Sequence, residues 1–299
     1  MTERHPTRRT TAGRAYLDLQ NKARRERRPT DELDQLYALE GFLARLAASS
    51  YADRFVVKGG VLLSAYDARR PTRDIDMQGQ RISSQVDNIL RIVRHIAAID
   101  LDDGLAFDTG AATAGAIRDV EEYGGARVSL SAALSTARLS LHIDVNVGDP
   151  IWPAPQPVAV PRLLGGTLEL TGYPLHMVLA EKIVTAVQRG TANTRWRDFA
   201  DIYALTNHNP VPGNNLQPAM NAVADYRQVE LAPLAQVLHG FDEIGQPHWI
   251  TWRRRLQLED DLPEQFSEVL AAVETFTDPA LSATVSELTW QPTTQTWTH

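Results

Sequence analysis

Two aspartates separated by one residue are the clearest candidates for chemistry in this sequence. Asp74 and Asp76 belong to a predicted short strand, 74–77, in which alternate residues point to the same side about 6.5–7 Å apart. A third acid, Asp144, lies on the polar face of a longer predicted strand, 138–147. Converging carboxylates repel each other by about 4 kcal/mol per pair at ~4 Å and an effective dielectric of 20. If these acids converge, they predict a bound cation, and oxygen-only ligands favour Mg²⁺ or Mn²⁺.

A glycine pair upstream of the acids predicts a phosphate-binding turn. Lys58-Gly59-Gly60 follows an apolar strand, 55–57, and opens a predicted short helix, 61–67. Glycine lets the backbone approach a ligand closely, and the first turn of a helix offers N–H groups to a phosphate. Ser64 lies one turn further on and is expected to face the same site. A lone Asp-x-Asp pair or Gly-Gly turn is also typical of ordinary solvated loops, so the prediction depends on their combination.

That combination resembles the DNA polymerase β nucleotidyltransferases. In that superfamily an apolar–Gly-Gly/Ser run and a short helix precede Asp-x-Asp on a strand, and a third acid follows on a later strand. Segments 55–63, 70–76 and 31–45 resemble more narrowly the AbiEii toxins of type IV toxin–antitoxin systems, a group that includes the mycobacterial MenT toxins. The resemblance covers roughly residues 14–210. It implies that Asp74, Asp76 and Asp144 are catalytic and hold the metal ions.

Two later segments match further motifs of the family. Lys182, on a predicted helix, corresponds to a lysine that binds the nucleoside triphosphate. Asp198 corresponds to a functional acid at a helix start, and Asp201, one turn on, is its close competitor. The ordinary alternatives are a solvated lysine, and an acid that caps its helix or pairs with Arg197.

The loop before the acids adds two candidate phosphate contacts. Thr72 stands where relatives carry Ser or Thr, and in some MenT systems the antitoxin phosphorylates that hydroxyl. A phosphate there would place nearly two negative charges beside the acids. Thr72 is equally well explained as a turn residue, and Arg70 as the partner of a nearby acid. The substrate-binding residues expected from the motifs are Lys58, Gly59, Gly60, Ser64, Arg70 and Thr72.

The resemblance implies nucleotidyl transfer from an NTP, with the 3′ end of tRNA as acceptor and a separately encoded antitoxin as partner. Two other interpretations stay open. One is a nucleotidyltransferase that AMPylates a protein, and the other is a non-catalytic regulatory member of the fold.

The elements that position these residues indicate an α+β protein. Strict alternation predicts the strand 138–147, and helical periodicity appears at 30–49, 86–99, 174–190, 195–206, 214–227 and 262–276. A proline-rich connector begins at Pro150 and precedes the expected domain boundary. We therefore expect a basic N-terminal arm (1–29), a polymerase β-type nucleotidyltransferase domain with a small mixed sheet flanked by helices (30–165), and a mainly helical C-terminal domain (166–299).

Composition limits the remaining possibilities. Of 299 residues 43% are hydrophobic and none is cysteine, which excludes disulfides, thiolate metal sites and a cysteine nucleophile. No apolar stretch approaches the roughly 18 residues of a membrane helix, so no membrane association is predicted and a cytoplasmic location is expected. The net charge is −7, but basic residues crowd between Arg4 and Arg28. This arm is a candidate RNA contact through phosphate neutralisation; a short helix or a solvated tail are its alternatives.

Overall fold

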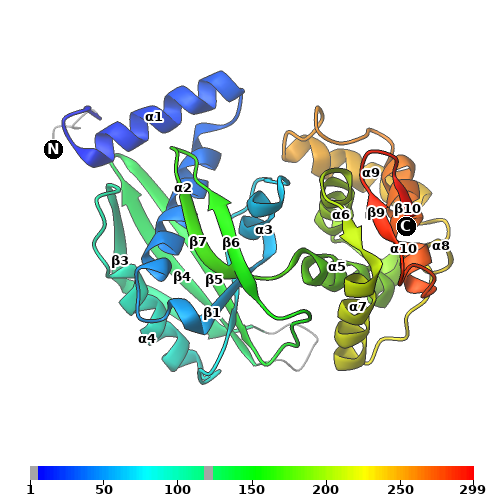
Figure 1. The fold of residues 1–299 in the computed structure, drawn as a ribbon. Helices are drawn as coiled ribbons and strands as arrows, with labels where there is room; N and C mark the ends of the chain where they lie inside the picture. Colours follow the sequence, from blue (N-terminus) through cyan, green and yellow to red (C-terminus); the bar gives the residue numbers. More distant parts are fainter. Residues whose placement is uncertain (1–5, 118–123) are drawn as a thin grey trace. The chain divides into compact units, whose positions relative to one another are not determined.

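The computed structural model describes residues 6–117 and 124–299, so Arg4 of the basic arm lies outside the described residues. The described chain divides into two compact units (Figure 1). Unit 1 runs to Ala65 and takes in Arg69–Asp149 and Gln156–Gly172. Unit 2 contains Tyr66–Ala68, Pro150–Pro155 and Tyr173–His299. The last change of unit thus follows Gly172 rather than residue 165.

A mixed sheet of seven strands forms the centre of unit 1. The strand order is β3-β4-β5-β2-β1-β7-β6. β2 pairs in parallel with β5, and β1 with β7, while the other neighbours are antiparallel. The α+β class with a mixed sheet is confirmed, although the sheet is larger than expected. The strands are β1 (Phe55–Lys58), β2 (Asp74–Gly79), β3 (Leu105–Ala116), β4 (Gly125–Leu134), β5 (Ala137–Val147), β6 (Gln156–Pro161) and β7 (Thr167–Gly172).

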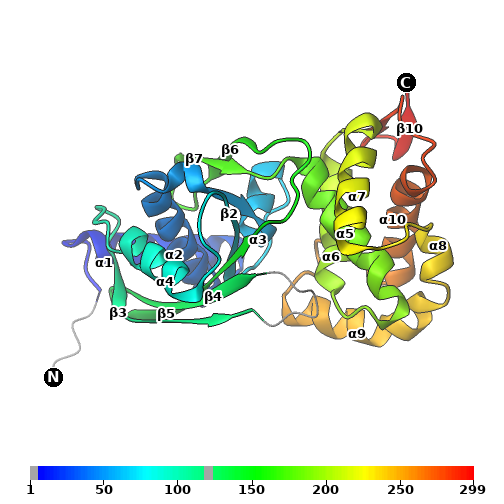
Figure 2. The same cartoon turned by 90° about the horizontal axis from the view of Figure 1, so that it is seen from below.

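The burial pattern of strand β5 shows which face of the sheet is apolar and buried. Leu141, Ile143 and Val145 are buried, whereas Asp144, between them on the other face, is half-buried. Helices α2 (Thr30–Ala47) and α4 (Val86–Ala97) contact each other and the sheet, and lie on one side of β3, β4 and β5 (Figure 2). Because the apolar side chains point to these helices, Asp144 points to the face that the helices leave uncovered.

The sequence patterns predict β1, β2 and β5 but not the other four strands. Strand β6 lies within the proline-rich segment, so the prediction of a connector is wrong there. The physical reason is its place in the sheet: β6 is an edge strand, and an edge tolerates Pro157 and Pro161 where no ladder N–H is required. The short helix predicted after the glycine turn is also different, since α3 spans only Gly59–Leu62 and a 3₁₀ turn, Leu63–Tyr66, follows it.

Much of the basic arm is helical. Helix α1 spans Thr11–Glu26 and buries Leu19 and Ala23, and it packs on α2 and β4. Its exposed side carries most of the arginines, but several of the cations have acidic partners nearby. Ion pairs join Arg8 to Asp18, Lys22 to Glu26 and Arg28 to Glu32. The short-helix alternative therefore describes this part of the arm, with part of its positive charge neutralised locally.

Unit 2 is mainly helical, as predicted, and has an aromatic core. The rings of Phe199, Phe241 and Phe266 lie 5.6–5.9 Å apart, and Trp249 stacks on Phe266 at 5.2 Å. Trp290, on a C-terminal hairpin, is buried as well. Within the described ranges, no helix combines the length and the apolar character needed to cross a membrane. The elements are α5 (Leu175–Arg189), α6 (Trp196–His208), β8 (Val211–Pro212), α7 (Gly213–Arg227), α8 (Leu234–Val237), α9 (Phe241–Arg255), α10 (Phe266–Leu281), β9 (Thr289–Gln291) and β10 (Thr296–Thr298).

Candidate active site

Four charged residues lie in one row across the sheet of unit 1. Asp76 of β2 is paired with Asp144 of β5 on one side and with Lys58 of β1 on the other. Asp144 is paired in turn with Arg127 of β4. Directly opposed residues on neighbouring strands project to the same face, and Asp74, two residues before Asp76, projects there too. The sheet therefore places the three predicted acids on one face, with Asp76 and Asp144 between two cations.

Arg127 holds Asp144 through two parallel hydrogen bonds. Its Nε donates to Oδ1 at 2.8 Å, and its Nη2 donates to Oδ2 at 2.6 Å. The side chain of Asp144 is only 12% exposed, whereas that of Arg127 is 50% exposed. The hydrogen bonds with Asp144 raise the pKa of Arg127 further above its ordinary value, and the charges of Asp74 and Asp76 act in the same direction. Arg127 is thus the counter-ion of Asp144.

The three acids have the chemistry of a divalent-cation site without enclosing one. Across residues 6–117 and 124–299, no group of three or more His, Cys, Asp or Glu side chains is gathered in a way that could hold a metal ion. The donors themselves fit a hard cation, because all are carboxylate oxygens on one face of the sheet. However, Arg127 occupies both oxygens of Asp144. An ion held by Asp74 and Asp76 would compete with Arg127 for the oxygens of Asp144.

The glycine turn after β1 packs directly against these acids. Gly59 has a φ of +70°, in the left-handed region, and a Cβ on it would lie 2.0 Å from Oδ2 of Asp76. A Cβ on Gly60 would lie 2.9 Å from Oγ1 of Thr72 and 3.2 Å from Nη1 of Arg70. Only glycine therefore fits at position 59. The turn, the loop residues Thr72 and Arg70, and the carboxylate of Asp76 are close neighbours, as the motif spacing suggested.

Lys58, at the end of β1, is buried beside the acids. Its Nζ lies 3.0 Å from Oδ2 of Asp149, the residue that follows the turn after β5. Asn146 also donates to this oxygen, at 3.4 Å. The ammonium group is therefore held in a fixed position next to Asp76, its partner across the strands.

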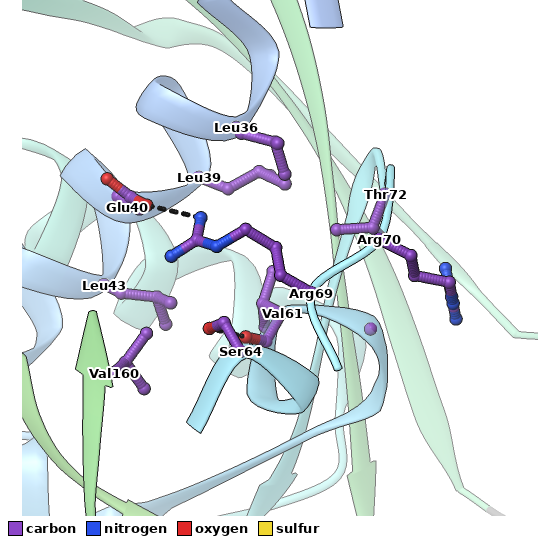
Figure 3. Close-up of a pocket in the computed structure, with 11 residues that line it drawn as sticks. Leu36, Leu39, Glu40, Leu43, Val61, Ser64, Arg69, Arg70, Thr72 and Val160 are labelled. Carbon is purple, nitrogen blue, oxygen red and sulfur yellow. Dashed lines mark hydrogen bonds and ion pairs between the residues drawn. The ribbon is translucent and has the colours of Figure 1, made fainter. Parts of the chain in front are cut away.

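Ser64 lines a small cavity beside the glycine turn (Figure 3). The cavity measures about 20 Å³, which is room for about one water molecule and far too little for a triphosphate. The Ser64 hydroxyl donates to the backbone carbonyl of Val61 at 2.9 Å. Glu40, whose pKa is raised by burial, accepts a hydrogen bond from Arg69 at 2.8 Å. Figure 3 shows Arg69 extending toward Glu40, whereas Arg70 extends away from it.

A second charged cluster lies in unit 2, between α5 and α6. Lys182 Nζ lies 3.0 Å from Oδ1 of Asp198 and 2.7 Å from Oδ2 of Asp201. Arg195 donates to the other oxygen of Asp198 at 2.6 Å. Burial acts to raise the pKa of Asp198, but Lys182 and Arg195 outweigh it and hold that pKa well below the ordinary range. Asp198 and Asp201 are both only 2% exposed. The two competing acids therefore form one buried cluster in which both bind the same lysine.

Sequence reasoning did not single out Arg127 or Asp149. A usable signal for Arg127 was present, because small and apolar residues alternate with polar ones through 125–134. A two-residue turn, 135–136, joins β4 directly to β5. Such a turn fixes the register of a hairpin, and this register pairs Arg127 with Asp144. No comparable pattern points to Asp149.

Solved structures similar to the chain include those of three other proteins. A protein from H. pylori named as a nucleotidyltransferase is 15% identical and is matched over 86% of this chain and 95% of its own, with a TM-score of 0.46. JHP933 from Helicobacter pylori is 14% identical, over 83% and 89% of the two chains, with a TM-score of 0.46. An antigenic nucleotidyltransferase-like protein from Paracoccidioides brasiliensis is 14% identical, over 69% and 94%, with a TM-score of 0.38. No curated protein matches the sequence significantly.

The family assignment comes from the sequence itself. Residues 41–274 match the model of the family described as "Nucleotidyl transferase AbiEii toxin, Type IV TA system". This range includes the glycine turn, the row of charges in unit 1 and the lysine–aspartate cluster in unit 2. The chain therefore belongs to the AbiEii nucleotidyl transferase toxin family of type IV toxin–antitoxin systems.

Proposed function

We propose that this member of the family is a metal-dependent nucleotidyltransferase toxin that transfers a nucleotide from an NTP to the 3′ end of tRNA. The observation that supports the chemistry is the row across β1, β2, β5 and β4, in which Lys58 and Arg127 flank Asp76 and Asp144. Three carboxylates on one sheet face have little structural use, whereas beside a glycine turn they suit a nucleoside triphosphate with its divalent cation.

In the proposed reaction, an oxygen of the acceptor hydroxyl attacks the α-phosphorus of the NTP. A new P–O bond forms, the bond to pyrophosphate breaks, and the hydroxyl proton passes to a carboxylate. Asp74 and Asp76 would hold the divalent cation, which neutralises charge on the triphosphate and on the leaving pyrophosphate. Asp144 is the proposed ligand of a second ion and the proposed proton acceptor, roles in which it competes with its hydrogen bonds to Arg127.

The phosphate contacts are proposed from charge and backbone shape. The buried ammonium of Lys58 and the bare backbone at Gly59 and Gly60 lie next to Asp76. Thr72 and Arg70 border the same turn. Of the unit 2 residues, Lys182 is the proposed triphosphate ligand, positioned by Asp198 and Asp201. Ser64 contributes to the packing under the turn, because its hydroxyl is bonded to the backbone.

The acceptor and partner come from the likeness to MenT toxins. tRNA would be blocked at its 3′ end, which would stop translation, and a separately encoded antitoxin would restrain the activity. If that antitoxin phosphorylates Thr72, the added charge would lie close to Arg70 and the glycine turn and would compete with the triphosphate.

Labelled nucleotides test this proposal directly. The full-length chain is incubated with each α-labelled NTP in turn, Mg²⁺ or Mn²⁺, and total tRNA, and the label is followed on gels. Label at the 3′ end of tRNA is the expected result, and it also identifies the nucleotide. Label on a protein would contradict transfer to tRNA and favour AMPylation of a protein. Nucleotide binding without any transfer would favour a regulatory member of the fold.

A further inference from the structure

An open groove of about 440 Å³ lies in unit 2, along the start of α6 and the second half of α9. Its lining has a distinctive composition: three arginines, two tryptophans, one histidine and two threonines, with no carboxylate. The chain as a whole has a net charge of −7, so this lining departs from the average surface. The residues that matter here are Arg195, Trp196, Arg197, His248, Trp252 and Arg255.

Two of the three arginines of this groove are exposed to solvent. Arg195 bonds to Asp198, but Arg197 and Arg255 are exposed side chains that border the same hollow. Like charges gathered over a concave surface repel each other and attract an anion. The arginines of the N-terminal arm differ, because acids within or next to that segment, such as Asp18, pair with several of its cations.

The aromatic residues of the groove are held as fixed planes. Trp196 stacks on the buried ring of Phe241 at 5.5 Å, with 11° between the planes. It also stacks on His248 at 5.9 Å and 15°, and His248 is exposed. Trp252 stacks on the buried Trp249 at 5.2 Å. Planes anchored in the core in this way lose little freedom when a further ring stacks on them.

We propose that this groove binds a single-stranded stretch of RNA. Phosphates would lie against Arg197 and Arg255, and an unstacked base would lie on the exposed face of His248, whose other face stacks on Trp196. Basic grooves with stacking platforms are the usual means of holding single strands. An acidic peptide would satisfy the arginines but would leave the aromatic planes unused. That the nucleic acid is RNA rests on the proposed function; the groove itself rests on the residues of unit 2.

Binding is measured on the full-length chain with no NTP and no metal, by fluorescence anisotropy of a short unstructured RNA across a salt series. The double variant Arg197→Gln/Arg255→Gln should bind at least about tenfold more weakly. Its log–log salt slope should be shallower by about 1.4, which corresponds to two phosphate contacts on a single strand. His248→Ala should weaken binding about fivefold or more, through loss of one stacked base. Arg254→Gln is the matched control, because Arg254 is exposed on the same helix and is not part of the lining.

Two results would overturn the proposal: equal RNA affinity of the double variant and the Arg254→Gln control, or competition by polyglutamate as effective as that by unlabelled RNA. The first would point to RNA binding elsewhere on the chain, and the second to an acidic partner. Failure of the proposed function gives a different result. If the groove variants lose RNA but no label is ever transferred to tRNA, the groove stands and the enzymatic proposal fails.

Discussion

Asp144 has two competing partners, the guanidinium of Arg127 and the proposed divalent cation. Both partners bind the same two carboxylate oxygens. The bidentate geometry at 2.8 and 2.6 Å keeps the carboxylate occupied. Positive charge at Arg127 also offsets the repulsion among Asp74, Asp76 and Asp144. At the scale of residues, we therefore expect binding of the metal to be coupled to the release of Arg127.

Arg127→Gln tests this coupling through metal affinity rather than activity. Without the guanidinium, the carboxylates are left to the cation, and the affinity for Mn²⁺ should rise at least about tenfold, or ~1.4 kcal/mol. Isothermal titration calorimetry of the nucleotide-free chain measures this. Arg138→Gln, an exposed arginine on the same hairpin, is the control and should leave the affinity unchanged. An unchanged or weaker affinity in Arg127→Gln would contradict the competition.

Asp198 predicts a dependence of stability on pH. Lys182 and Arg195 hold its pKa below the ordinary value of 3.8 despite burial. A lowered pKa in the folded state means that its stabilisation is present above about pH 4 and is lost as the pH falls further. Asp198→Asn should therefore lower the free energy of unfolding by about 3 kcal/mol or more at neutral pH.

Denaturant melts at neutral and acidic pH measure this effect. The difference between wild type and Asp198→Asn should shrink as the pH is lowered below about 4. Asp260→Asn, an exposed acid of unit 2, is the control and should show little effect at any pH. A difference for Asp198→Asn that is the same at both pH values would mean that its charge is not what stabilises the cluster.

At the scale of elements, the glycine turn where β1 meets α3 packs against the carboxylate of Asp76. Gly59→Ala adds a methyl group 2.0 Å from the Asp76 carboxylate, at a φ of +70°. We expect a loss of about 1–2 kcal/mol in stability from the backbone, and a loss of nucleotidyl transfer because Asp76 must move. Gly165→Ala separates the two effects, since Gly165 has a φ of +98° but open space around it. That variant should lose stability and keep transfer; equal transfer in both variants would contradict the role of the turn.

The elements also show how far the sequence alone could predict this site. The alternation of apolar and polar residues around Asp144 predicted the strand that carries this acid. The glycine pair and its spacing to Asp74 predicted the turn and the strand that follows it. The register that brings Asp76 beside Asp144 was not readable, because β2 and β5 are parallel and a long connection gives no register. The proline-rich strand β6 was missed because its edge position, which is a property of the whole sheet, is what permits proline.

At the scale of the whole molecule, the residues proposed for the chemistry are divided between two units. Unit 1 carries the acids and the glycine turn, whereas unit 2 carries the Lys182 cluster and the basic groove. Unit 2 is nearly continuous in sequence and has its own aromatic core, built around Phe241 and Phe266.

A fragment of residues 173–299 should therefore fold on its own. We expect a helical circular dichroism spectrum with a cooperative thermal transition, and no nucleotidyl transfer, since the acids are absent. The full-length chain is the reference for both measurements. A fragment without a cooperative transition would show that unit 2 depends on unit 1, and a fragment that transfers nucleotides would refute the assignment of the acids.

The most direct test of the account is the rate of label transfer from an NTP to tRNA by Asp76→Asn. This change removes one charge from the centre of the row while keeping the size of the side chain. Transfer should fall by about 100-fold or more, the scale expected when charge stabilisation at a reacting phosphate is lost, with the thermal melting temperature unchanged or higher. Asp53→Asn, an exposed acid of unit 1 outside the row, should transfer at the wild-type rate. Wild-type transfer by a folded Asp76→Asn protein would contradict the central claim.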